Sequence, residues 1–106
     1  MKYSDEVKII AEREGHNLKV VSINDSHADF RTNTANIPFP KDNLTYYVAL
    51  HELGHFHVDQ KPYWIAEGKA WQWALEHVKE KPNNETKELI AESILEELLM
   101  DSKVKF

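Results

Sequence analysis

The apolar positions near the N-terminus recur with the period of an α-helix. Ser4 is a suitable N-cap residue, and Gly15 can end a helix in the left-handed conformation. Between them, residues spaced three and four apart form one apolar stripe: Val7, Ile10 and Ala11. The pattern therefore predicts an amphipathic helix between residues 4 and 15.

The next segment predicts a small sheet. Three short runs have the composition or the alternation of extended chain, at residues 18–23, 28–32 and 35–39. Because Pro38 and Pro40 cannot donate to a β-ladder, the third run is expected at an edge of the sheet. As an edge strand, it would be free to pair with an extended peptide.

The rest of the chain predicts three helices. Asp42 or Asn43 begins the first, which runs through His57, and Pro62 lies in the first turn of the next, which ends near Lys79. A final amphipathic helix carries the apolar residues Leu89, Ile90, Ile94, Leu95, Leu98 and Leu99. The expected fold class is α+β, with an N-terminal helix, a three-stranded sheet and three further helices in one domain over residues 1–106.

Composition narrows the classes of function. The 106 residues suffice for one domain, and the absence of cysteine excludes a disulfide framework or a thiolate metal site. A net charge of −5 without a basic cluster argues against a nucleic-acid partner. The start of the sequence lacks the apolar core of a signal peptide, and no apolar run is long enough to span a bilayer. We therefore expect a cytoplasmic protein with no membrane partner.

The sequence H-E-L-G-H at residues 51–55 matches the H-E-x-x-H pattern. On a helix, His51 and His55 lie one turn apart on the same face, where two imidazoles can bind one Zn²⁺. Both fall on the apolar stripe of their helix, which also includes Leu44, Tyr47, Val48 and Val58. Glu52 lies beside the stripe, where it can act as general base on a water at the zinc.

A catalytic zinc needs a third protein ligand, and the helix after Pro62 offers two carboxylates for it. Glu67 lies at the centre of an apolar stripe, where an unpaired carboxylate is costly and a cation would compensate it. Glu76 lies on the opposite, solvated face and is the second choice. The stripe consists of Tyr63, Trp64, Ala70, Trp71, Ala74 and Val78.

The remaining polar residues receive weaker assignments. Asp59 is a candidate for orienting a ligand histidine, and His57 is expected at the surface or in such a supporting role. His16 and His27 lie in predicted turns and are expected to be solvated. His77 and Tyr63 are the two candidates for stabilising an oxyanion, and neither is preferred.

These motifs resemble those of the ImmA/IrrE-type zinc metallopeptidases, zincins in which a glutamate completes the zinc site (gluzincins). The resemblance rests on A-L-H-E-L-G-H at residues 49–55 and on E-G-K-A-W-Q-W-A at residues 67–74, which matches the family's E-x-x-A-x-x-F-A with Trp73 in place of phenylalanine. It implies a minimal zincin-like fold, Glu67 as third ligand, and a hairpin such as 28–30 with 36–38 before the H-E-x-x-H helix. In zincins the edge strand at this place receives the substrate backbone.

The sequence thus predicts a metallopeptidase that hydrolyses peptide bonds of a protein or peptide substrate. His51, His55 and Glu67 would bind Zn²⁺, and Glu52 would be the general base. The alternative is a zinc-stabilised, catalytically silent protein-binding module of phage or mobile-element type. A metal-free helical protein with a chance motif is the third interpretation. Substrate identity and oligomeric state are left open.

Overall fold

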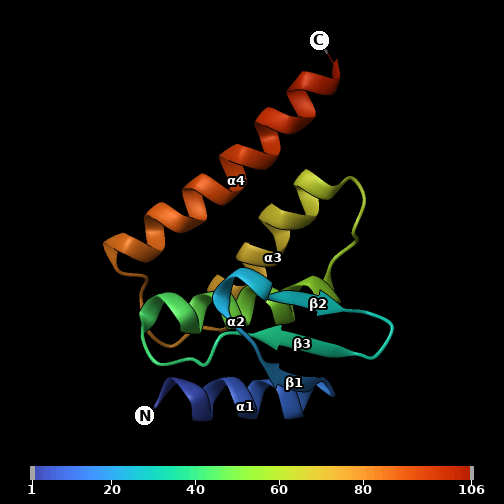
Figure 1. Cartoon of the computed structure of the whole chain (residues 1–106). Coiled ribbons are helices and arrows are strands. Elements are labelled where there is room, and N and C mark those ends of the chain that lie inside the picture. The colour runs from blue at the N-terminus through green and yellow to red at the C-terminus, as the bar shows by residue number, and fades with distance from the viewer. Residues whose placement is uncertain (1, 106) are drawn as a thin grey trace.

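The computed structural model describes residues 2–105, and it describes the side chains of residues 2–63 and 65–95. Within this range the chain is an α+β protein, as expected, with four helices and a three-stranded mixed sheet (Figure 1). Two short 3₁₀ helices, η1 and η2, lie between these elements. The elements are α1 (Tyr3–Glu14), β1 (Asn17–Val20), η1 (Ile23–Asp25), β2 (His27–Asp29), β3 (Thr34–Ile37), α2 (Asn43–Gly54), η2 (His55–His57), α3 (Tyr63–His77) and α4 (Asn84–Lys105).

The sheet corrects one expectation. The strand order is β1-β3-β2, with β3 parallel to β1 and antiparallel to β2, so β3 is the central strand and not an edge. Pro38 and Pro40 follow Ile37, where β3 already ends, and therefore do not remove any donor from its ladders. The predicted hairpin does form, between β2 and β3. The edges of the sheet are β1 and β2.

The N-terminal helix follows its apolar stripe, because Val7, Ile10 and Ala11 are all buried. Gly15 has a φ of 79° and ends the helix in the left-handed region, as predicted. The predicted cap was wrong: the N-cap is Lys2, without a side-chain hydrogen bond, and Ser4 lies inside the first turn. The first strand is also shorter than predicted, because the chain turns into η1 at Ile23.

Helix α2 forms the centre of the core, and it packs against the sheet and against the three other helices. Its start is as predicted, at a capping box in which Asp42 accepts from the backbone N–H of Thr45 at 2.9 Å. Its α-helical part ends at Gly54, and η2 continues the chain through His57. Residues 45–54 are all buried, so the helix is covered on every side.

Helix α3 approaches α2 closely at Gly54. A Cβ atom on Gly54 would lie 2.7 Å from the backbone carbonyl oxygen of Ala70, a distance that real contacts do not allow. Glycine at this position therefore lets the two helix backbones come together. The close approach brings the H-E-x-x-H segment against the residues of α3.

The apolar stripes predicted for α3 and α4 agree only partly with which of their side chains are buried. Ala70, Trp71 and Ala74 are buried, whereas Tyr63 is 55% exposed and Pro62 is the N-cap of α3. On α4 the residues Leu89, Ile90 and Ile94 pack against the core and Leu95 is exposed. The side chains of Trp64, Leu98 and Leu99 lie outside the described ones.

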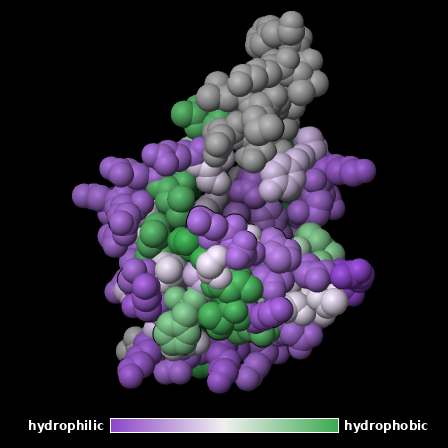
Figure 2. All heavy atoms as spheres, in the orientation of Figure 1, coloured by the Kyte–Doolittle hydropathy of each residue, from purple (hydrophilic) through white to green (hydrophobic). Residues whose placement is uncertain are grey.

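The face seen in Figure 1 is largely hydrophilic and carries apolar patches (Figure 2). Exposed apolar side chains include Val20 and Phe39 near the sheet and Phe30 after β2. None of the described helices combines the length and the apolar character that a membrane crossing requires.

Candidate metal centre

His51, His55 and Glu67 meet between α2 and α3. The Nε2 atom of His51 lies 3.0 Å from Oε2 of Glu67, and the Nε2 atom of His55 lies 3.0 Å from Oε1 of the same carboxylate. All three residues are buried, with His51, His55 and Glu67 each 6% exposed. The structure thus brings together the residues that the helical faces of α2 and α3 single out.

The side chain of Gln60 fixes the orientation and the tautomer of His55. Gln60 Nε2 donates to the backbone carbonyl oxygens of His55 at 2.6 Å and of Val58 at 2.7 Å, which leaves its Oε1 facing His55 Nδ1 at 3.1 Å. Because an amide oxygen only accepts, Nδ1 of His55 must carry the proton and donate it. The Nε2 atom of His55 therefore faces Glu67 Oε1 at 3.0 Å, where a proton or a metal ion can lie between the two atoms.

His51 presents a second free nitrogen to the same place. Its ring stacks on Trp71, with centroids 4.0 Å apart and planes inclined by 12°. Although Nε2 is close to Glu67, the direction does not suit a hydrogen bond, and this buried atom has no hydrogen-bond partner among the described residues. A buried nitrogen without a hydrogen-bond partner, beside a carboxylate and a second imidazole, is suited to be a metal ligand.

Two side chains hold the Glu67 carboxylate from outside, and a third holds one of these two. Ser93 on α4 donates to its Oε2 at 3.2 Å, and the hydroxyl of Tyr63 donates to its Oε1 at 3.3 Å. Trp71 Nε1 in turn donates to Ser93 Oγ at 3.2 Å. Such outer contacts orient metal ligands and raise their affinity for the ion.

The carboxylates of Glu52 and Glu67 favour a positive charge at the site. Burial favours the neutral imidazole of His51, but Glu52 and Glu67 outweigh burial and raise the pKa of His51 to about 9. Burial likewise opposes ionisation of Glu67, yet His51 and His55 hold the pKa of this carboxyl far below its usual range. In the absence of a metal ion, a proton neutralises the site. The donor set of two imidazoles and one carboxylate is the one that Zn²⁺ binds in many hydrolases.

Glu52 lies beside these ligands. Its Oε2 is 3.6 Å from Nδ1 of His51, and one oxygen of Glu52 and one nitrogen of each histidine lie within 4.8 Å of one another. Among the described residues, these three form the one such group of possible metal ligands. Glu67 stands outside that group but contacts the Nε2 atoms of both histidines, so the site holds two carboxylates in different positions.

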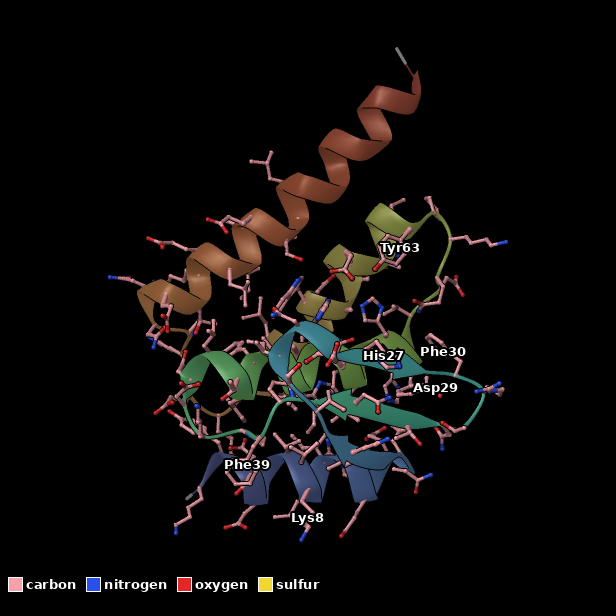
Figure 3. All side chains as sticks on the ribbon, viewed as in Figure 1. Lys8, His27, Asp29, Phe30, Phe39 and Tyr63 are labelled. Carbon is pink, nitrogen blue, oxygen red and sulfur yellow. The ribbon has the colours of Figure 1, made fainter. Side chains whose placement is uncertain are left out.

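A pocket of about 180 Å³ opens onto the site. Glu52, His55 and Glu67 line it from α2, η2 and α3, and Gln60 lines it from the loop between η2 and α3. Tyr63 also lines it from the first turn of α3, and on the other side His27 and Phe30 come from β2 and the turn after it (Figure 3). The residues that complete the pocket are Ser26 and Ala28.

Several of the weaker sequence assignments change. Glu76 is exposed on α3, and Asp59 is exposed on the surface. The residue that orients a ligand histidine, the role suggested for Asp59, is Gln60. His77 stacks on Trp73 and its Nδ1 donates to the carbonyl oxygen of Trp73 at 2.7 Å, so it does not line the pocket, whereas Tyr63 does.

Other residues had escaped the sequence analysis. His27 is exposed, as expected, but it also lines the pocket, and Ser93 was not considered. A helical wheel can place Ser93 on the inner face of α4 with Leu89 and Ile90, but no pattern connects that face with Glu67. Nothing in the sequence around His27, apart from its position before a predicted strand, indicates a place in the pocket.

Models of known protein families, curated protein sequences and solved structures were compared with this chain, and none of them matches it.

Proposed function

We propose that the protein is a zinc-dependent peptide hydrolase with a minimal zincin-like fold of the gluzincin type, similar to the ImmA/IrrE family. His51, His55 and Glu67 would hold Zn²⁺, and Glu52 would be the general base. The observation that carries this proposal is the convergence of two imidazole Nε2 atoms on one buried carboxylate, at 3.0 Å each, beside a pocket that His55 and Glu67 line.

The positions of the two carboxylates support different roles for them. Glu67 faces the Nε2 atoms and is held in place by Ser93 and Tyr63, as expected of a ligand. Glu52 faces the opposite nitrogen of His51, the Nδ1 atom, and lines the pocket. A carboxylate beside the ligands with access to the pocket is suited to exchanging protons with water.

When bound, Zn²⁺ brings the pKa of a coordinated water close to neutrality and polarises a carbonyl group. The protein side chains supply the rest. Glu52 accepts the proton of the attacking water and passes it to the leaving amine. Gln60 and Trp71 keep the two imidazoles in place. The Tyr63 hydroxyl, which donates to Glu67 in this structure, would turn to the substrate oxygen as negative charge develops there.

The geometry of the pocket favours an extended peptide as substrate. β2 is an edge strand and lines the pocket through His27 and Ala28, so a peptide backbone can add to it as a further strand. This role moves from the central strand β3, where the sequence had suggested it, to β2. Phe30 is 53% exposed and Tyr63 is 55% exposed at the pocket, which favours an apolar substrate side chain.

The test combines zinc quantification with cleavage of a peptide library by the unmodified protein and by Glu52→Gln. After removal of excess and weakly bound metal, we expect one retained zinc per chain in both proteins, and hydrolysis by the unmodified protein only. The rate of Glu52→Gln should fall by about 10²–10⁴-fold, the usual contribution of a general base.

The possible outcomes separate the interpretations. Zinc binding without cleavage by the unmodified protein would point to the silent binding module, and absence of zinc would point to a chance motif. Equal cleavage by Glu52→Gln would reject Glu52 as the base while leaving the zinc ligands in place.

A further inference from the structure

A second pair of histidines lies outside the buried centre. His16 comes directly before β1, and His57 is the last residue of η2. Their Nε2 atoms are 3.0 Å apart. Neither side chain takes part in the function proposed above, and the helical pattern of the sequence does not connect them.

Asn33 fixes the tautomer of His16. Asn33 Nδ2 donates to the carbonyl oxygen of Gly15 at 2.7 Å, which leaves its Oδ1 facing His16 Nδ1 at 2.6 Å. Since Oδ1 only accepts, His16 carries its proton on Nδ1. Its Nε2 is therefore a free lone pair directed at His57. The same arrangement, in which the other ring nitrogen donates to a fixed acceptor, is typical of histidines that bind metals.

Aromatic neighbours hold both rings in place. His57 stacks on Trp73 with centroids 4.7 Å apart and planes inclined by 5°, and His16 stacks on Phe56 with centroids 4.4 Å apart and planes inclined by 18°. Two imidazole nitrogens that bind one ion at about 2.0–2.1 Å each lie roughly 3 Å apart. The observed separation of the two Nε2 atoms therefore fits a shared ion without rearrangement of the backbone.

Glu14 at the end of α1 offers a third ligand. Its Oε1 lies 4.0 Å from Nε2 of His57, while its Oε2 accepts from Arg13 Nε at 3.1 Å. The oxygen nearer His57 is thus the one that Arg13 does not hold, and it would have to move closer to complete a group of three ligand atoms with both histidines. The side chains of His57 and Glu14 are 25% and 29% exposed, so an ion from solvent can reach them and Glu14 can turn toward it.

We infer that His16 and His57, together with Glu14, form a second, surface metal site for a late first-row dication such as Zn²⁺ or Ni²⁺, the ions that imidazole suits. Without the ion, His57 Nε2–H donates to His16 Nε2. On binding, His57 gives up the Nε2 proton and takes one from solvent on Nδ1, so the imidazole stays neutral and its Nε2 lone pair faces the ion. The site joins the end of α1 and the start of β1 to η2, and it does not depend on the proposed hydrolase activity.

The experiment titrates Ni²⁺ into protein that has been treated with zinc and freed of excess metal. We expect one equivalent of Ni²⁺ to bind in addition to any retained zinc. Because His57 stacks on Trp73, the bound Ni²⁺ should quench tryptophan fluorescence. His16→Gln and His57→Gln should each weaken this Ni²⁺ binding by at least about tenfold, without loss of the retained zinc.

Two further variants serve as controls. His77→Gln removes another imidazole that stacks on Trp73, at 3.9 Å, but is outside the pair, and should leave the Ni²⁺ equivalent unchanged. Trp73→Phe should abolish the quenching and keep the equivalent. If the unmodified protein takes up no Ni²⁺ beyond its zinc, or if both His16→Gln and His57→Gln bind it unchanged, the inference is wrong.

Discussion

The two histidine pairs of this protein are built alike and differ in their surroundings. In each pair an amide side chain fixes the tautomer of one imidazole, Gln60 for His55 and Asn33 for His16. In each pair a tryptophan also stacks on one ring, Trp71 on His51 and Trp73 on His57. Only the buried pair has a carboxylate 3.0 Å from both of its free nitrogens.

That difference determines what each pair requires. In the buried pair, two imidazole nitrogens and a carboxylate face one another at 3.0 Å, so a proton or a metal ion must lie among them. At the surface, one imidazole can donate to the other, and water can satisfy the remaining groups. Because of the buried carboxylate, more than the spacing of the histidines, we expect the pair on α2 and η2 to be the stronger of the two proposed metal sites.

The largest effect is expected from Glu67→Gln, which removes the charge and keeps the size. Zinc affinity of the buried site should fall by more than about 100-fold, because a ligand matters more than the outer contacts that are worth about 10–100-fold. Glu76→Gln on the exposed face of the same helix is the matched control and should leave zinc unchanged. Equal zinc affinity in the two variants would contradict Glu67 as a ligand. Ni²⁺ binding at the surface site should be the same in both variants.

The amide side chains should separate the two sites. Gln60→Ala should weaken zinc binding at the buried site by about 10–100-fold and leave the surface Ni²⁺ equivalent intact. Asn33→Gly should weaken Ni²⁺ binding at the surface site and leave zinc binding at the buried site intact. Glycine is the replacement because Asn33 has a φ of 54°, a conformation that glycine adopts without strain. Competition with a chelator measures both affinities. A variant that weakens both sites equally would show that the two do not act separately.

The smallest effect concerns the packing that positions the buried pair. Gly54→Ala should destabilise the protein by about 1–3 kcal/mol, because its Cβ would meet the carbonyl oxygen of Ala70 at 2.7 Å. Gly68→Ala, where a Cβ meets nothing within 4 Å, should stabilise α3 by about 0.5–1 kcal/mol. Denaturant unfolding measures both, and a stable Gly54→Ala would mean that α3 is not held this closely.

Much of the buried site is predictable from local pattern. His51 and His55 share a helical face at a fixed spacing, and Glu67 is the carboxylate at the centre of an apolar stripe. The sheet was less predictable. The prolines at 38 and 40 suggested an edge strand, but β3 ends at Ile37 and pairs on both sides. Because β3 ends two residues earlier than predicted and lies at the centre of the sheet, the proposed peptide-binding edge is β2 instead.

By itself, the sequence determined the α+β class, the helical faces and the three side chains that meet at the buried site, because helical periodicity depends only on neighbouring residues. The tertiary structure alone decided which distant groups support them: Gln60 behind His55, Ser93 beside Glu67, and His16 against His57. These contacts join separate elements, and their distances depend on how closely the elements pack. The approach of α2 to α3 at Gly54 is one such distance, and it lets Glu67 reach both buried histidines.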